Sequence, residues 1–279
     1  MKIISIETGN FKLDGGAMFG VVPKSLWERT NPADDRNLCS WAMRSMLVDY
    51  GERKVLIDNG IGDKQSDKFF SYYHLHGDAC LVSSLASNGY HPDDITDVFL
   101  THLHFDHCGG GVKYNVKGEL VTVFKNATYW SNELHWNLAM NPNDRERASF
   151  LKENLVPMKA SGQLDFIKND GIFLPGFDVL FAHGHTESQM IPHIKYKGNT
   201  IVFAADLLPS VGHIPLPYVM GYDTRPLTTL KEKKVFLETV AKKGYTIFLE
   251  HDYYQSCCTL KETDKGIRLD KSFHFEDKF

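Results

Sequence analysis

The sequence has no excess of positive charge, no long hydrophobic run and no C-x-x-C pair. The chain has 31 Lys and Arg and 35 Asp and Glu, which gives a net charge of −4. This charge gives no sign of a basic surface that would bind nucleic acid. No apolar run approaches the roughly 20 residues that a membrane span needs. Residues 1–7 are too soon acidic for a signal peptide and indicate a first strand. We therefore expect neither a nucleic-acid nor a membrane partner.

The number of cysteines bears on the redox state and location of the protein. The five cysteines are odd in number, so reduced thiols in a cytoplasmic protein are the simplest interpretation. A hydrophobic content of 42% and a charged content of 24% are typical of a globular protein. The 279 residues are enough for a sizeable core, and the chain shows no repeat or low-complexity linker.

The residue pattern predicts strands with helices between them. We expect strands at 45–50, 54–59, 97–101, 121–124, 127–130, 179–182, 191–196, 200–204 and 247–249, and a final hairpin over 260–270. Helices are expected over 78–88, in two pieces over 132–154, and over 229–243. The last helix opens with a capping-box spacing at Thr229 and stops at Gly244. The two similar halves favour two packed sheets with helices outside and a site at the strand ends.

The segment 101–107 is Thr-His-Leu-His-Phe-Asp-His, directly after an apolar strand. Imidazole and carboxylate are the ligands of catalytic zinc and of related metals. In an extended segment His102 and His104 point to the same side. The turn towards the glycines at 109–111 can aim Asp106 and His107 at a neighbouring point. The spacing therefore suggests two metal ions.

A metal site needs ligands from more than one loop. His185, Asp206 and His251 each follow an apolar strand and could meet at one rim. His183 lies close to His185 and is interpreted as a neighbour only. Asp58 ends another strand, where it would orient a ligand histidine or cap a turn.

In this order, these residues resemble the metallo-β-lactamase superfamily of metallohydrolases from about residue 45 to 255. The resemblance implies an α+β fold, a four-layer αββα sandwich with the metals at the edge between two sheets. We expect one domain over 1–279, with a strand and substrate loop over 1–44 and a hairpin over 256–279. The implied ligands are His102, His104 and His185 for one metal, Asp106, His107 and His251 for the second, and Asp206 as the bridge.

Two departures within the superfamily favour a dinuclear hydrolase. Asp206 stands where penicillin-destroying zinc enzymes commonly use Cys, and His104 stands where oxygen-reducing di-iron members carry Glu. The stretches 14–27, 205–209 and 220–223 resemble N-acyl-homoserine lactonases and methyl-parathion hydrolases. Some lactonases place a substrate-binding Tyr three residues after the bridging Asp, where this chain has Pro209. Tyr222 and His213 are the candidates to replace it.

The resemblance implies a lactonase that acts on a small molecule, an N-acyl-homoserine lactone in quorum quenching. Two cations lower the pKa of a shared water, and the hydroxide opens the ring. Asp106 would ligate, orient the nucleophile and move a proton to the leaving group. Met18, Phe19, Val22 and Trp27 would contact the acyl chain or simply pack the first loop.

The alternatives share most of these residues. The same site could act on phosphotriesters, aryl esters or thioesters, or the chain could be a non-catalytic or redox di-metal protein. Zinc is the default metal for this ligand set, and Mn, Fe, Co and Ni bind similar ligands. A homodimer is an expectation from the resembling group.

Overall fold

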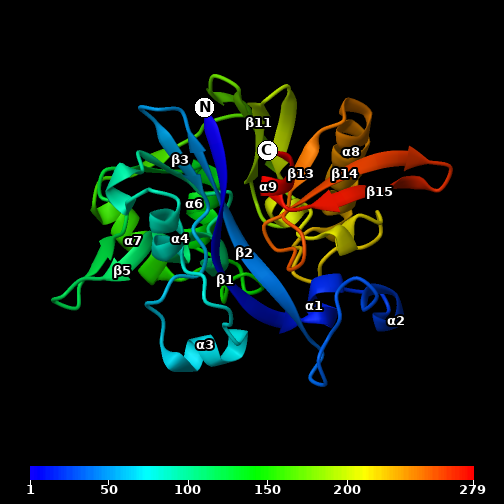
Figure 1. Cartoon of the computed structure of the whole chain (residues 1–279). Coiled ribbons are helices and arrows are strands. Elements are labelled where there is room, and N and C mark those ends of the chain that lie inside the picture. The colour runs from blue at the N-terminus through cyan, green and yellow to red at the C-terminus, as the bar shows by residue number, and fades with distance from the viewer. The chain divides into compact units, whose positions relative to one another are not determined.

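The computed structural model describes all 279 residues, which fold into two compact units (Figure 1). Unit 1 comprises residues 1–10 and 43–169, and unit 2 comprises residues 11–42 and 170–279. Two long strands, β1 (Lys2–Asp14) and β2 (Leu38–Asp49), contribute residues to both units. All five cysteines are free thiols. None of the helices combines the length and the apolar character that a membrane span requires.

Unit 1 is built on a six-stranded sheet in the order β1-β2-β3-β4-β7-β8. The strands after β2 are β3 (Lys54–Ile57), β4 (Asp97–Phe99), β7 (Thr128–Ser131) and β8 (Leu164–Phe166). These four pair in parallel, whereas β2 and β3 are antiparallel. A separate hairpin consists of β5 (Val112–Tyr114) and β6 (Leu120–Thr122).

The core of unit 1 lies between this sheet and three helices, α4 (Leu81–Ser87), α6 (Glu133–Met140) and α7 (Lys152–Ala160). Leu56 and Val98 of the sheet belong to the same buried cluster as Leu85, Trp136 and Leu155 of the helices. Burial of such side chains contributes about 1.5–3 kcal/mol each. The shorter elements are α3 (Asp67–Tyr73), η1 (Pro92–Asp94), α5 (Phe105–Cys108) and η2 (Gly109–Gly111).

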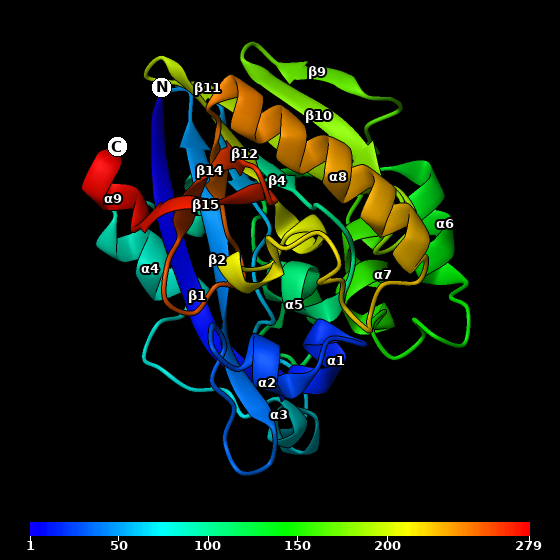
Figure 2. The ribbon, with the colours of Figure 1, turned by 90° about the vertical axis from the view of Figure 1, so that its right-hand side faces the viewer.

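Unit 2 contains a seven-stranded sheet in the order β15-β14-β13-β12-β11-β10-β9. Its strands are β9 (Gly171–Leu174), β10 (Phe177–Ala182), β11 (Gln189–Tyr196), β12 (Asn199–Phe203), β13 (Thr246–Phe248), β14 (Cys257–Thr263) and β15 (Gly266–Phe273). Only β12 and β13 are parallel neighbours, and α8 (Pro226–Lys243) connects them. The helix runs obliquely across the sheet (Figure 2) and buries Phe236, Leu237 and Val240. The shorter elements are α1 (Gly15–Phe19), α2 (Lys24–Trp27), η3 (Ala205–Leu207), η4 (Val211–His213) and α9 (Phe275–Lys278).

The predicted start of the longest helix was wrong. α8 begins at Pro226 rather than Thr229, and Arg225 precedes it without a side-chain cap. Proline suits the first helical turn because its missing N–H would have no partner there. The predicted end was right, since Gly244 takes the left-handed conformation with φ of 65°. In addition, α4 begins three residues later than the predicted 78, and turns separate α6 from α7 over 141–151.

Candidate metal centre

The parallel strands of unit 1 deliver the first set of ligand candidates. β3 and β4 are neighbours that are buried except at Lys54, and their carboxyl ends lie at the same edge of the sheet. Asp58 follows β3 and His102 follows β4, so the two reach one place. Backbone bonds then pin the loop, because Asn59 N donates to His107 O at 2.8 Å and Gly110 N donates to Gly60 O at 2.9 Å. The ligand segment is therefore fixed by the sheet edge.

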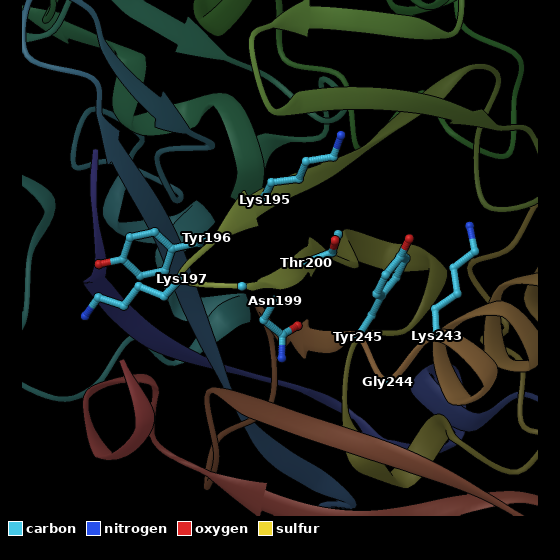
Figure 3. Close-up of a pocket in the computed structure, with 9 residues that line it drawn as sticks. Lys195, Tyr196, Lys197, Asn199, Thr200, Lys243, Gly244 and Tyr245 are labelled. Carbon is cyan, nitrogen blue, oxygen red and sulfur yellow. The ribbon is translucent and has the colours of Figure 1, made fainter.

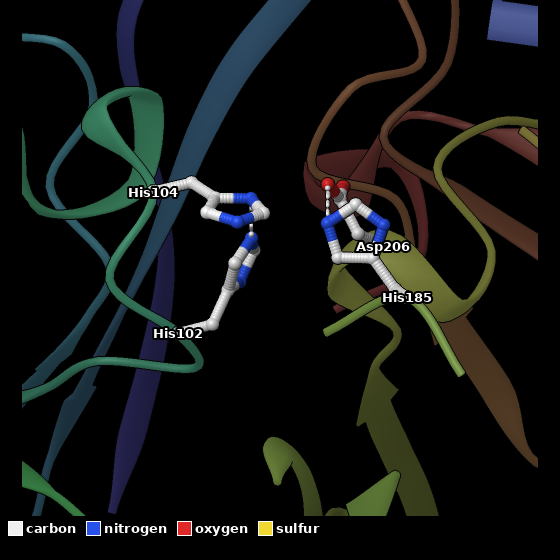
Figure 4. Close-up of side chains that lie close together, drawn as sticks. All are labelled: His102, His104, His185 and Asp206. Atoms are coloured by element: carbon white, nitrogen blue, oxygen red, sulfur yellow. Dashed lines mark hydrogen bonds and ion pairs between the residues drawn. The ribbon is translucent and has the colours of Figure 1, made fainter. Parts of the chain in front are cut away.

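The strand predicted over 97–101 ends two residues earlier than expected. β4 ends at Phe99, the next residues are irregular, and α5 begins at Phe105. His102 and His104 nevertheless face each other, with His102 Nε2 3.1 Å from His104 Nδ1 (Figure 4). Both are buried. Two ring nitrogens this close can share one cation.

Asp58 supports two histidines of this set. Its carboxylate accepts the His107 Nδ1–H at 3.0 Å and the Thr101 hydroxyl at 2.6 Å. The same hydroxyl lies 3.1 Å from His102 Nδ1. A ring nitrogen bound to a carboxylate carries the proton, so the other nitrogen of His107 keeps its lone pair for a metal. That nitrogen lies 3.8 Å from Asp106 Oδ2.

Unit 2 assembles the second set around Asp206. Asp206 follows β12 and His251 follows β13, the parallel pair of this sheet. One oxygen of Asp206 lies 3.0 Å from His185 Nε2 (Figure 4). The other lies 3.1 Å from His251 Nε2. A carboxylate whose two oxygens face two different imidazoles is arranged as a bridging ligand would be.

The far nitrogens of these imidazoles are also held. His251 Nδ1 donates to Ala42 O at 2.8 Å, and His185 Nδ1 donates to Asp223 Oδ1 at 3.0 Å. Because a carbonyl oxygen can only accept, the His251 proton sits on Nδ1. Nε2 is then the ligand atom, as in metal sites supported by outer hydrogen bonds. The donor set thus fits a divalent metal.

Electrostatics at His185 agrees with this interpretation. Burial by itself lowers the pKa of His185, but the carboxylates of Asp206 and Asp223 outweigh burial and raise it to about 10. The pocket around Nε2 therefore attracts positive charge. A divalent cation would satisfy the same two carboxylates more strongly than a single proton does.

Two acidic residues near the ligands were not recognised from the sequence as supports. Asp223 holds His185, and Glu146 Oε1 lies 3.7 Å from His104 Nε2. Asp223 lies in the stretch 220–223 that resembles the lactonases. An acidic residue in that stretch was the signal that the sequence offered. Glu146 lies in a turn-rich stretch with no such signal. His183, expected to be a neighbour only, bonds through Nδ1 to Glu187 at 2.7 Å.

Most of the predicted substrate contacts are packed inside unit 2. Met18, Phe19 and Trp27 are buried, and the Phe19 ring stacks on Trp27 at 5.2 Å and on His213 at 4.3 Å. His213 uses both ring nitrogens, towards Ser210 Oγ at 2.8 Å and Met18 O at 2.9 Å. Burial lowers the pKa of His213 to about 3, so this imidazole is neutral. Packing is thus the arrangement observed, and substrate contact stays a prediction.

Val22 and Tyr222 complete the predicted contacts. Val22 is buried, whereas Tyr222 is 40% exposed. A group of aromatic rings was not predicted from the sequence. The ring centroids of Phe69 and Tyr73 in α3 lie 5.3 and 4.7 Å from that of Phe105, the residue before Asp106. No residue of α3 is fully buried. This helix therefore offers accessible apolar surface beside the ligand motif.

A separate hollow of about 460 Å³ lies at the turn between β11 and β12 and the end of α8 (Figure 3). Lys195, Thr200, Lys243 and Tyr245 are among its lining residues. None of the metal-ligand candidates lines it. The hollow is a surface feature of unit 2 and takes no part in the ligand sets.

Comparison with known proteins identifies the family. The model of the metallo-beta-lactamase superfamily matches residues 44–251. An N-acyl homoserine lactonase of Bacillus thuringiensis is 24% identical over 276 residues, covering 94% of this chain and 98% of that protein. An N-acyl homoserine lactonase of Bacillus cereus is 23% identical over 238 residues, covering 80% and 85%.

Solved structures share the fold. A probable metal-dependent hydrolase from Staphylococcus aureus superposes with a TM-score of 0.89 and 28% identity, covering 99% of this chain and 97% of that one. AidC, a dizinc quorum-quenching lactonase in complex with a product, gives a TM-score of 0.79 at 20% identity, covering 97% and 94%. The expected fold, hydrolase class and dinuclear type of site agree with these findings. The chain belongs to the metallo-β-lactamase superfamily and is a metal-dependent hydrolase.

Proposed function

We propose that this protein is a dinuclear lactonase that opens N-acyl-homoserine lactones. The two ligand sets would bind one pair of divalent cations, with zinc as the default metal. The ligands would be His102, His104 and His185 for the first cation, Asp106, His107 and His251 for the second, and Asp206 for both. The observation that carries the metal site is the anchoring of Nδ1 in His107, His185 and His251, which leaves each Nε2 to ligate.

The residues of the chain divide the chemistry between them. When bound, two cations supply hydroxide near neutral pH and polarise the carbonyl oxygen of the substrate. Asp106 would take the proton released during attack and return it to the departing alcohol oxygen. Asp58 and Asp223 would keep the imidazoles in the required tautomer. The product is an acyl-homoserine, with one water added across the ester bond.

The lactone substrate is supported by similarity to named relatives. Six curated N-acyl homoserine lactonases match the chain, several of them over almost their whole length. Phe69, Tyr73 and Phe105 give apolar surface beside Asp106, which suits an acyl chain. Pro209 cannot donate a hydrogen bond to the carbonyl, so we assign that contact to Tyr222, which is partly exposed.

The same ligands would also serve other esters. Phosphotriesters, aryl esters and thioesters all need a hydroxide and a stabilised leaving group. A redox di-metal role is a weaker alternative, because a purely imidazole and carboxylate set also suits zinc, which has no redox chemistry. We also propose a cytoplasmic location from the free thiols, a single functional domain over 1–279, and a homodimer.

The test is a substrate panel with the purified, zinc-loaded full chain. We expect ring opening of acyl-homoserine lactones, followed by acid release, at a kcat/KM at least tenfold above that for aryl esters, thioesters or phosphotriesters. Asp106→Asn serves as the inactive control with its metal content measured. A rate for every lactone equal to that of buffer would reject the lactonase proposal. A higher kcat/KM for a phosphotriester or a thioester would reject the lactone as the preferred substrate but would leave the proposed metal site unchanged.

A further inference from the structure

Lys233 is a lysine whose side chain is buried, although an ammonium group is normally most stable in water. It lies on the inner face of α8 with 1% of its surface exposed. Its ammonium donates to three backbone carbonyls, Pro215 O at 3.1 Å, Leu216 O at 3.4 Å and Tyr218 O at 2.7 Å. No carboxylate forms an ion pair with it. Lys233 therefore forms its hydrogen bonds with backbone carbonyls, and all three carbonyls belong to one segment.

That segment, residues 215–225, leads to the candidate metal centre. Asp223 accepts the His185 Nδ1–H, and Thr224 N donates to His185 O at 3.0 Å. Arg225 N donates to Gly184 O at 2.9 Å. The end of the segment thus fixes both the ring and the backbone of His185, about five residues after the carbonyls that Lys233 holds.

The same segment also contacts the N-terminal loop. Gly221 N donates to Ala17 O at 2.8 Å, and the Tyr218 ring meets the Phe19 ring edge-on at 6.4 Å. The space beside Gly20 is closed by Val219 O, which a Cβ there would meet at 2.9 Å. The 215–225 segment therefore joins the N-terminal loop to His185, and Lys233 anchors it from α8.

Burying this ammonium costs stability. Burial lowers the pKa of Lys233 to about 7, although the Asp223 carboxylate opposes the change. An apolar side chain of similar length would fill the position without desolvating a charge, which is the largest cause of the lowered pKa. A group that costs stability at a site is expected where it serves the activity instead.

We propose that Lys233 is a positioning residue for the metal centre: by holding the carbonyls of Pro215, Leu216 and Tyr218 it fixes the segment that orients His185. The proposal deepens the proposed function, because it assigns part of the metal affinity to a residue that touches neither metal nor substrate. It predicts that stability and metal binding respond to Lys233 in opposite directions. A residue with only a structural role would change both together.

The test compares Lys233→Met with Lys231→Met, an exposed lysine on the same helix. Zinc affinity is measured on the full chains at pH 6.5 by competition with a chromophoric chelator, and the cobalt(II) absorption spectrum is recorded. We expect Lys233→Met to melt at or above the wild-type temperature, to bind zinc about threefold to tenfold more weakly, and to show a shifted cobalt band. Replacing Asp223 directly should cost more, about 10–100-fold, as for other supports of metal ligands.

Lys233→Gln, which keeps two N–H donors, is the second variant if Lys233→Met does not fold. Zinc affinity and a cobalt spectrum unchanged from Lys231→Met would overturn the proposal. A parallel loss of melting temperature and zinc affinity in both Lys233 variants would also overturn it, because that result shows a structural role alone. These readouts need no substrate. A wild-type chain that binds zinc but opens no lactone would therefore reject the lactonase proposal, and the role proposed for Lys233 would still be tested by zinc affinity. A wild-type chain that binds no zinc rejects both.

Discussion

At the scale of single residues, the orientation of each imidazole depends on what its far nitrogen meets. Asp58, Asp223 and the Ala42 carbonyl hold three of the candidate ligands through Nδ1. The candidate ligands were predictable, because four of them lie within six residues of sequence. The anchors were less so, since Asp223 lies 38 residues from His185 and only the folded chain brings them together. Asp58 was predictable as an acidic strand end, and its contact with His107 is present.

Asp58→Asn should weaken metal binding more than it weakens the fold. The amide offers N–H where His107 and Thr101 need acceptors, so the imidazole of His107 loses its preferred tautomer. We expect zinc affinity to fall about 10–100-fold, measured by chelator competition. Asp264→Asn in the exposed hairpin turn is the matched control and should bind zinc as the wild type does. Equal affinities of the two variants would contradict the role of Asp58.

Asp106→Asn should reduce turnover. Loss of the carboxylate removes a proton acceptor, and general acid–base groups contribute about 10²–10⁴-fold to rate. We expect kcat for the lactone to fall by about that factor, measured with each chain at its own bound-metal content. If kcat per bound metal pair stayed within threefold of the wild type, Asp106 would be a ligand without a role in proton transfer.

At the scale of elements, each unit uses a parallel strand pair to deliver ligands. β3 and β4 carry Asp58 and His102, and β12 and β13 carry Asp206 and His251. The apolar runs predicted these strands because fully buried strands lack alternation. The predicted strand 97–101 ends at Phe99, and the bond from Leu103 N to His135 Nε2, a partner 32 residues away, could not be read from the local pattern.

Close packing of the His185 loop on α8 gives a prediction for Gly184. A Cβ at Gly184 would lie 2.3 Å from Thr229 N, so the loop or the helix must move. We expect Gly184→Ala to lower the free energy of unfolding by about 1–3 kcal/mol and to weaken zinc binding, as followed by chemical denaturation and metal titration. Gly16→Ala, whose Cβ would meet only side-chain atoms, Asp14 Oδ1 at 3.0 Å and Asn37 Nδ2 at 3.7 Å, should be near neutral. A stable Gly184→Ala with normal zinc affinity would show that the loop adapts.

At the scale of the whole molecule, the sequence predicted the family fold and the candidate ligands that cluster in the structure, but it did not predict the burial of Lys233. The fold follows from strand and helix patterns that act locally. The burial of Lys233 depends on where α8 meets a loop that has no regular structure, and no local pattern encodes that contact.

The buried lysine makes global stability depend on pH. In the folded chain the pKa of Lys233 is about 7 against an ordinary value of 10.5, so between these values the unfolded chain binds more protons than the folded one. Stability from this group therefore rises as pH increases from 7 to 10.5, and its penalty is complete below pH 7. We expect the free energy of unfolding of Lys233→Met minus that of the wild type to shrink over pH 7–10, by urea denaturation. A difference independent of pH would contradict the shifted pKa.

The most direct test of the account is the metal dependence of lactone opening by one sample of the protein. Acid release from an N-acyl-homoserine lactone is followed by pH-stat after the chelated chain is titrated with zinc. We expect no rate above buffer without metal, and a rate that rises until about two equivalents per chain are bound. Activity that persists in the metal-free chain, or zinc binding at two equivalents with no ring opening, would contradict it.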